Sequence, residues 1–296
     1  MKRLEYLITQ VRNSTDNKDV NGVSTAEIVS YFNDAQSYIT TLIFKNNPYA
    51  DLFKVQVELP AVSSGEYILP DDCYSTNALS MVEARFADTS NNKGYSRIKP
   101  IMESEFSYIF GYITRDNKVL ISGQNDVAQL QNVRITYFKQ LPTLDIRRGQ
   151  IVAPFTTTSF SVSGLDSEVF TMNDMFSVVG QTGDQGAKGI YSTSTSSPMT
   201  TSAAKVTEII AAGSTYSSVY LVSGANACNK SQLPDVCETY LLDYVRQRIY
   251  TRNNYDDASK QMYFTEQRQA EILSIFSKNK KDDDTIPVTD VEFLFF

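Results

Sequence analysis

Apolar residues recur at three- and four-residue steps in the first fifty positions of the chain. Two such runs, over 4–11 and 28–42, predict a short helix followed by a longer one, each with one buried face. Ser24 to Glu27 has capping-box spacing and predicts where the longer helix begins, and Pro48 follows its expected end. The apolar positions are Leu4, Leu7, Ile8, Val11, Ile28, Phe32, Ala35, Ile39 and Leu42.

The hydrophobic period changes from about 3.6 to about 2 at Phe53. In FKVQVEL the apolar residues alternate with Lys54, Gln56 and Glu58, as in a strand with one solvent-facing side. A first β region is therefore predicted over 53–150. Its further strands are expected in EYIL, LSMVEARF, KVLIS and VRITYF, and a short helix is expected in IMESEFSYIFG.

The composition shifts between Ile151 and Lys230. Of these 80 residues 32 are Ser, Thr or Gly and 8 are charged, which by itself would suit a linker. Short apolar runs recur between the turn residues, however, and they predict a folded insertion, a small barrel or sandwich. These runs are FSVVG, KGIYS, KVTEIIAAG and VYLVSG.

The helical period returns after Pro234. One apolar face runs from Val236 to Ile249, through Tyr240, Leu241, Tyr244 and Val245. An Asn/Asp turn follows, with Asp256 or Asp257 as the expected N-cap of a second helix. That helix is expected to present Met262, Tyr263, Ile272, Leu273 and Phe276. A helical hairpin this short must pack on another element, most simply on the helix over 25–45.

The fold class predicted from these patterns is α+β. The two ends of the chain are expected to form a helical bundle, with an antiparallel β sheet or barrel region inserted between them and an extended C-terminal tail after it. The expected parts are the helical segment 1–52, the first β region 53–150, the β insertion 151–230, the helical hairpin 231–281, which packs on 1–52, and the tail 282–296.

The composition narrows the possible chemistry. The chain has no His, which removes the commonest general base and transition-metal ligand and excludes Ser-His-Asp triads and zinc-protease motifs. Catalysis by carboxylates alone remains open. A net charge of −7 argues against a nonspecific grip on phosphates. Cys73, Cys228 and Cys237 lack zinc-site spacing and are expected to be free thiols. With no apolar run of membrane-spanning length, a cytosol-like compartment is expected.

Four further patterns have a functional and a structural interpretation. Paired Asp256 and Asp257 could bind metals, but they fit a helix cap better. The glycines of QTGDQGAKG, at 183, 186 and 189, could cradle a phosphate, but a hairpin loop suits them better. Arg147 and Arg148 are too few for a nucleic-acid patch, and Asp282 to Asp284 are typical of a solvated spacer. We therefore expect no catalytic residue, no metal site and no cofactor.

The C-terminal tail carries the candidate binding residues. An acidic run with Pro287 precedes an apolar end, which is unusual for a free terminus. Burial of its last four residues would contribute roughly 6 to 12 kcal/mol before ordering costs. These residues could dock on their own domain, but the tether favours insertion into a groove or sheet edge of another subunit. The candidates are Val291, Phe293, Leu294, Phe295 and Phe296.

Several segments together resemble the head-to-tail adaptor (connector) proteins of short-tailed bacteriophages. The resemblance covers the helical ends and the first β region, whereas the insertion over 151–230 departs from the smallest members of that family. The segments are STAEIVSYFNDAQSYITTLI, LPDDC, RIKPIMESEF, VRITYFKQLPTL and LPDVCETYLLDYVRQRIYTRNNYDDASKQMYF.

The resemblance implies a structural virion protein that is not an enzyme. Such proteins form a homo-oligomeric ring, commonly dodecameric, beneath the portal protein at the capsid vertex. The ring extends the DNA channel and is a platform for the downstream tail protein, and DNA passes through it without specific binding. It implies the virion as the final location, the host cytoplasm during assembly, and no membrane. It also suggests that the C-terminal tail clasps the portal through Val291 and Phe293 to Phe296. The alternatives are a β-rich virion fibre or adhesin-like binding module and a hydrolase that uses carboxylates alone.

Overall fold

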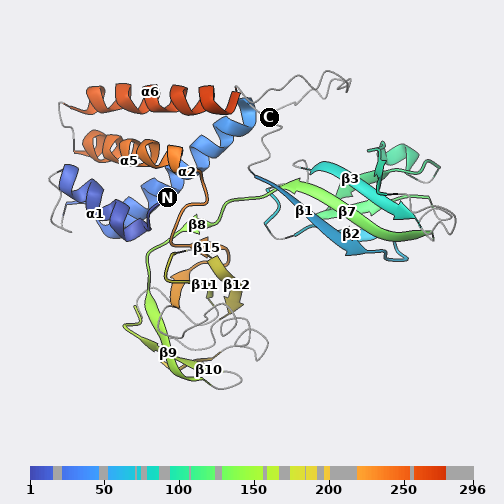
Figure 1. The fold of residues 1–296 in the computed structure, drawn as a ribbon, viewed down its shortest axis with the longest axis horizontal. Helices are drawn as coiled ribbons and strands as arrows, with labels where there is room; N and C mark the ends of the chain where they lie inside the picture. Colours follow the sequence, from blue (N-terminus) through green and yellow to red (C-terminus); the bar gives the residue numbers. More distant parts are fainter. Residues whose placement is uncertain are drawn as a thin grey trace. The chain divides into compact units, whose positions relative to one another are not determined.

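A computed structural model gives the fold in two compact units. It describes residues 1–15, 22–46, 53–70, 72–74, 79–86, 94–106, 108–123, 129–155, 159–166, 174–183, 185–191, 197–200, 219–253 and 257–277. Unit 1 combines residues 1–49 with 142–296, and unit 2 consists of residues 50–141. The protein is a mixed α and β structure whose sheets are mainly antiparallel, as the sequence predicts (Figure 1).

Unit 2 contains two small antiparallel sheets. A four-stranded sheet has the order β1-β7-β3-β4, and a three-stranded sheet has the order β2-β6-β5. The alternation in FKVQVEL is confirmed, because β1 turns Val55, Val57 and Leu59 towards the core and leaves Gln56 and Glu58 exposed. The strands are β1 Lys54–Pro60, β2 Glu66–Ile68, β3 Leu79–Phe86, β4 Ser96–Ile98, β5 Tyr112–Arg115, β6 Lys118–Ile121 and β7 Leu130–Phe138.

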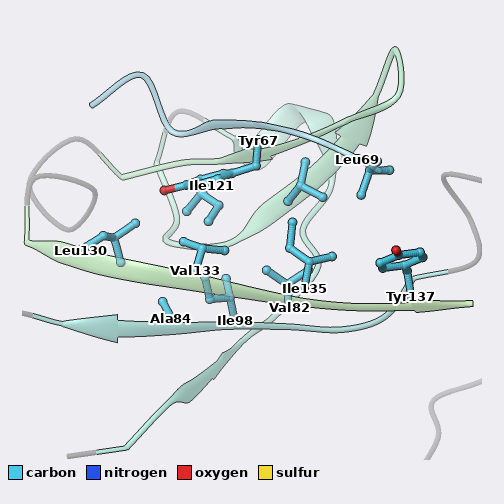
Figure 2. Close-up of a cluster of buried hydrophobic side chains, with 11 residues drawn as sticks. Tyr67, Leu69, Val82, Ala84, Ile98, Ile121, Leu130, Val133, Ile135 and Tyr137 are labelled. Carbon is cyan, nitrogen blue, oxygen red and sulfur yellow. The ribbon is translucent and has the colours of Figure 1, made fainter. Parts of the chain in front are cut away.

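The core of unit 2 lies between these two sheets. Figure 2 shows side chains from β2 and β6 facing those from β3, β4 and β7. Tyr137 closes one end of the core, where its hydroxyl donates a 2.8 Å hydrogen bond to the carboxylate of Asp72. Burial and this contact raise the pKa of Tyr137. Strands β1, β2, β3, β6 and β7 therefore match the predicted ones, and β4 and β5 were not predicted.

The prediction of a short helix in IMESEFSYIFG is wrong, except for a single helical turn. Among the described residues of this segment, only Glu103–Glu105 is helical, as a 3₁₀ turn labelled η3. Pro100 pairs instead with Tyr112 as an isolated bridge, which draws the chain back towards β5. A Cβ atom at Gly111 would lie 2.4 Å from the Ile101 side chain, so this close backbone approach requires glycine.

The N-terminal segment of unit 1 contains two helices. Helix α1 spans Leu4–Ser14 and α2 spans Thr25–Asn46. All nine predicted apolar positions except Leu42 are buried. The N–H of Glu27 donates to Ser24 Oγ at 3.2 Å, so Ser24 caps α2 as its sequence spacing predicts.

The C-terminal half of unit 1 supplies the helical hairpin. Helix α5 spans Glu238–Arg252 after the 3₁₀ turn η5 at Asp235–Cys237, and α6 spans Ala258–Ser277. Helix α5 packs against α6, α2 and α1, and α6 also packs against α2, so helices from both ends of the chain meet in unit 1 (Figure 1). Asp257 precedes α6 directly, and its backbone carbonyl accepts the first helical hydrogen bond, from Gln261.

Two predicted helix faces need correction. Val236 is 43% exposed because it lies in the η5 turn, whose tighter winding puts it out of phase with α5. Met262 and Tyr263 are 50% and 58% exposed, whereas Ile272 is buried. The buried side of α6 is set by its contacts with α5 and α2, and it passes through Thr265 and Ile272.

Unit 1 also contains a six-stranded sheet with the order β12-β11-β14-β9-β10-β13. It fills much of the predicted insertion. Among the described residues no sheet closes into a barrel, so the sheet half of the prediction is the correct one. A two-stranded parallel pair, β8 with β15, adjoins it. The strands are β8 Thr143–Leu144, β9 Gly149–Phe155, β10 Ser159–Ser163, β11 Met175–Val179, β12 Gln185–Tyr191, β13 Met199–Thr200, β14 Tyr220–Ser223 and β15 Ala227–Cys228.

This sheet has its own apolar core. Phe160 from β10 and Phe176 from β11 are fully buried, with ring centroids 6.0 Å apart in an edge-to-face arrangement. FSVVG, KGIYS and VYLVSG correspond to β11, β12 and β14, whereas KVTEIIAAG lies outside the described residues. The glycine-rich segment QTGDQGAKG joins β11 to β12, which confirms a hairpin connection. Gly183 adopts a φ of 88° in the turn.

Candidate functional site

Among its described residues, helix α6 exposes four large apolar side chains, three of them consecutive. Met262, Tyr263 and Phe264 are 50%, 58% and 52% exposed, and Ile275 is 47% exposed. Three consecutive helical residues span about 200° around the axis, so the first three occupy the half of α6 opposite its buried side. In soluble monomers, apolar side chains gathered in this way mark interaction surfaces. Helix α6 is therefore a candidate for a binding surface in the described part of the chain.

A cleft of about 500 Å³ follows one flank of this helix, between α5 and α6. Phe264 and Arg268 line it from α6, and Asp243 and Arg246 line it from α5. Asp243 is almost completely buried, at 8% exposure. The lining of the cleft is thus mainly polar and charged, with Phe264 as its apolar side chain and Asp243 as a buried carboxylate.

Asp243 is held by two guanidinium groups. Its carboxylate accepts a 3.0 Å hydrogen bond from Arg246 Nη1 and lies 4.0 Å from Arg268 Nε. Arg246 also donates to Ser14 Oγ on α1 at 2.9 Å, and Arg268 pairs with Glu271 at 2.8 Å. Because opposite charges surround the carboxylate, it is placed to link α1, α5 and α6 and not to act as a general base.

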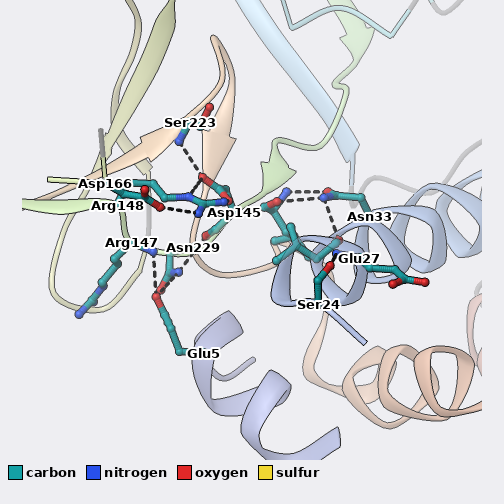
Figure 3. A network of polar contacts seen from close by, with 12 residues as sticks. Glu5, Ser24, Glu27, Asn33, Asp145, Arg147, Arg148, Asp166, Ser223 and Asn229 are labelled. Carbon is teal, nitrogen blue, oxygen red and sulfur yellow. Dashed lines mark hydrogen bonds and ion pairs between the residues drawn. The ribbon is translucent and has the colours of Figure 1, made fainter. Parts of the chain in front are cut away.

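A second polar cluster joins the helices of unit 1 to the six-stranded sheet (Figure 3). The Asp145 carboxylate accepts hydrogen bonds from Arg148 at 2.8 and 3.1 Å and from the Ser223 N–H at 2.8 Å. Arg148 also pairs with Asp166 at 3.0 Å. Burial alone would lower the pKa of Arg148, but Asp145 and Asp166 outweigh it and raise that pKa.

Glu5 and Asn229 extend this cluster to α1. Glu5 Oε1 accepts from the Arg147 N–H at 3.0 Å and from Asn229 Nδ2 at 2.8 Å. The Arg147 guanidinium stacks 3.9 Å from the Tyr220 ring and donates to the Gln181 carbonyl at 2.6 Å. Arg147 and Arg148 are therefore both engaged inside unit 1, which supports the prediction that they do not form a nucleic-acid patch.

Helix α2 is tied to the same region by its amide side chains. The Asn33 side chain exchanges two hydrogen bonds with the backbone of Leu144, of 2.6 and 2.9 Å (Figure 3). Gln36 donates to the Pro142 carbonyl at 2.8 Å and accepts from Ser231 Oγ at 2.6 Å. These contacts fix two chain segments, one around Leu144 and one around Ser231, that connect the helices with the sheet.

The binding residues predicted from the sequence lie outside the described residues. This applies to Val291 and Phe293 to Phe296, and also to the acidic run Asp282 to Asp284 and to Asp256. Asp257 is described, and its carboxylate pairs with Lys260 at 2.9 Å in the first turn of α6. Those predictions consequently stay predictions, and the surface of α6 is a separate candidate.

The three cysteines are free thiols, as predicted. Cys228 and Cys237 are buried, and Cys73 is half-buried. Burial raises the pKa of Cys237 to about 12, so this thiol is neutral and unreactive at physiological pH.

No protein-family model and no curated protein matches this chain. In the described part of the chain, no helix is long and apolar enough to cross a membrane. The same residues contain no group of three or more potential metal ligands. The function is therefore argued from the sequence resemblance and from the surfaces described above.

Sequence reasoning missed Phe264 and the cleft. The apolar period predicts that Met262 and Tyr263 lie on the buried face of the helix. It does not show how many apolar residues α6 can bury against its two neighbouring helices. The available signal was three consecutive large apolar residues, MYF, because a helix cannot turn all three towards one core.

Proposed function

We propose that this chain is a structural subunit of a phage head-to-tail adaptor, a ring beneath the portal that extends the DNA channel and receives the tail. The helices from both ends of the chain act as one bundle that forms the wall of the ring. The observation that carries this proposal is the packing of α1 and α2 against the α5–α6 hairpin within unit 1. It supports the arrangement on which the sequence resemblance depends.

The exposed surface of α6 also supports a subunit role. Burial of its exposed apolar side chains against another protein would be favourable. A ring provides a neighbour on each side of every subunit. The net charge of −7 suits a channel wall that DNA passes without adhering. The ring would be a homo-oligomer, commonly dodecameric in the resembling family, that contacts the portal above and a tail protein below.

Electron micrographs of the purified protein with its cognate portal test the proposal. We expect rings stacked coaxially on the portal, with a central channel wide enough for duplex DNA. Trimers by mass measurement, without portal binding, would support the alternative of a fibre or adhesin-like module. Protein that neither forms rings nor binds the portal would contradict the adaptor proposal.

The tail is assigned to portal binding and tested separately. A variant that ends at Asp284 lacks Val291 and Phe293 to Phe296, and we expect it to stay folded but to lose attachment to the portal. Replacement of Asp282, Asp283 and Asp284 by Ser is the matched control, because it changes the tether and keeps the apolar end. Normal attachment of the shortened protein would contradict the role of the tail.

A further inference from the structure

Helices α1, α5 and α6 form a row with α5 in the middle (Figure 1). Helix α5 contacts both α1 and α6, and Arg246 on α5 reaches Ser14 on α1 as well as Asp243. Among the described residues, the outer faces of α1 and α6 are therefore the two free ends of the row. A row with two different free ends can continue from one copy to the next.

The two free ends match in helical geometry. On α6 the outermost residues are Tyr263, Gln267, Ala270 and Ser274, all exposed. On α1 and the residues just before it, the outermost positions have the same spacing of four, three and four residues. They are Lys2, Tyr6, Thr9 and Asn13, and all are exposed. Each end thus presents one straight stripe along its helix with an exposed tyrosine near one end.

The two free ends also carry opposite unpaired charges. Arg3 is exposed beside the α1 stripe, with its side chain against Gly183, and Glu266 is exposed on α6. Among the described residues no ion pair involves either of them. Lys2 adds positive charge, although it lies 3.4 Å from Glu238. Complementary charge at separate surfaces favours contact of unlike ends over contact of like ends.

The exposed area is consistent with a contact between subunits. Four half-exposed side chains, at 50%, 58%, 52% and 47%, leave roughly 400 Å² of apolar surface on α6 in water. A stable interface buries about 800 Å² on each partner, of which a little over half is apolar. Met262 and Phe264 lie on opposite flanks of Tyr263, so a contact on the outer face of α6 buries part of this apolar area, and the polar residues of the stripe supply the rest of the interface.

We infer that the outer face of α6 in one copy packs on the outer face of α1 in the next copy. The contact is head-to-tail, so it generates a ring or an open filament, whereas contact between two α6 faces would stop at a dimer. This inference rests on the proposed ring and names the two surfaces that close it. Phe264 and Tyr263 supply the apolar centre, and Arg3 with Glu266 supplies a charge pair at the rim.

Two blocked variants test the inference in solution. Tyr263→Glu with Phe264→Glu blocks the α6 end, and Tyr6→Glu with Thr9→Glu blocks the α1 end. All four side chains are exposed, so both variants should fold. By analytical ultracentrifugation the wild type should form large assemblies and each variant alone should be monomeric. An equal mixture should give one-to-one pairs and nothing larger, because only one intact interface remains.

Tyr108→Glu in unit 2 is the matched control. Its side chain is 88% exposed, and the same chemical change there should leave assembly unaltered. Arg3→Glu and Glu266→Arg should each weaken assembly by about fivefold, and the combination should restore it. Loss of assembly in the control but not in the α6 variant would overturn the inference.

The remaining outcomes separate the inference from the adaptor proposal. If the α1-blocked variant pairs with itself, α6 faces meet each other and the head-to-tail contact is overturned. If the wild type is monomeric at every concentration, the inference fails even where micrographs show the protein on its portal. If rings form and both blocked variants still form them, the adaptor proposal stands and these surfaces are wrong.

Discussion

The two helices of the C-terminal hairpin differ in how much of their surface the fold uses. Helix α5 buries six of its 15 residues, including Tyr240, Leu241 and Val245, and contacts three other helices. Helix α6 is longer, at 20 residues, yet it buries only Thr265 and Ile272 fully among its described side chains. Both helices come from similarly apolar sequence, so apolar content alone does not distinguish a core helix from a surface helix.

The difference assigns separate tasks to the two helices. Substitutions on α5 should lower stability whether or not the protein assembles, and substitutions on the outside of α6 should leave stability nearly unchanged. The effect of each substitution on the free energy of unfolding therefore distinguishes a residue of the core from a residue of the binding surface.

Truncation of Tyr240 should have the largest effect. Its side chain is fully buried, so Tyr240→Ala should lower the free energy of unfolding by about 3–5 kcal/mol, as other large-to-small changes in cores do. Urea titration followed by helical circular dichroism measures this. Tyr240→Phe is the control, because the hydroxyl has no hydrogen-bond partner among the described residues, and it should cost less than about 1 kcal/mol.

Alkaline pH should destabilise unit 1 through Cys237, just before α5. Burial raises its pKa from 9.0 to about 12, so the neutral thiol stabilises the fold below pH 9. Between pH 9 and 12 the unfolded chain ionises and the folded chain does not, so stability falls by up to about 1.4 kcal/mol per pH unit. The melting temperature should fall less steeply with pH across this range for Cys237→Ala than for the wild type. Equal slopes for both proteins would contradict the assignment.

Loss of the Asp243 carboxylate should have an intermediate effect. Asp243→Ala leaves Arg246 without its partner beside the cleft and should cost about 1–3 kcal/mol. Glu271→Ala is the control, because it removes a carboxylate from the same cleft at an exposed site and should cost less than about 0.5 kcal/mol. Comparable losses in thermal denaturation would show that Asp243 does not link the helices.

The outer residues of α6 should have the smallest effect on stability. Tyr263→Ser and Met262→Ser should each change the free energy of unfolding of the dissociated chain by less than about 0.5 kcal/mol. Ile272→Ala, on the buried side of the same helix, should cost about 2–4 kcal/mol and serves as the contrast. If Tyr263→Ser proves as costly as Ile272→Ala, the outer face belongs to the core of the monomer.

Most of the local structure could be predicted from the sequence where period and burial agree. The alternation from Lys54 to Leu59 gave β1, and the spacing from Leu4 to Val11 gave the buried face of α1. Strand β9 was missed because GQIVAPF breaks the alternation with Gly149 and Pro154, and β10 was missed because the alternation in SFSVS is short and lies in a serine-rich segment. Their place in the sheet depends on neighbours far along the chain, including β14.

The candidate surface was less predictable than the fold. A sequence shows that Met262, Tyr263 and Phe264 are apolar, but the side of α6 that is buried depends on how α5 and α2 meet it. Likewise, Asp145 gives no sequence signal for its contact with Ser223, because Ser223 lies 78 positions further along the chain in β14 and donates through its backbone. Contacts of this kind are set by tertiary packing and not by local pattern.

The cluster around Asp145 and Asn229 has a mechanical consequence. Two chain segments, 142–148 and 229–233, run between the helices of unit 1 and the six-stranded sheet, and side chains of α1 and α2 grip both. A pull on the sheet would load these hydrogen bonds side by side and not one after another. The joint would then yield only at a force that breaks several of them together, a property that the proposed adaptor role would require.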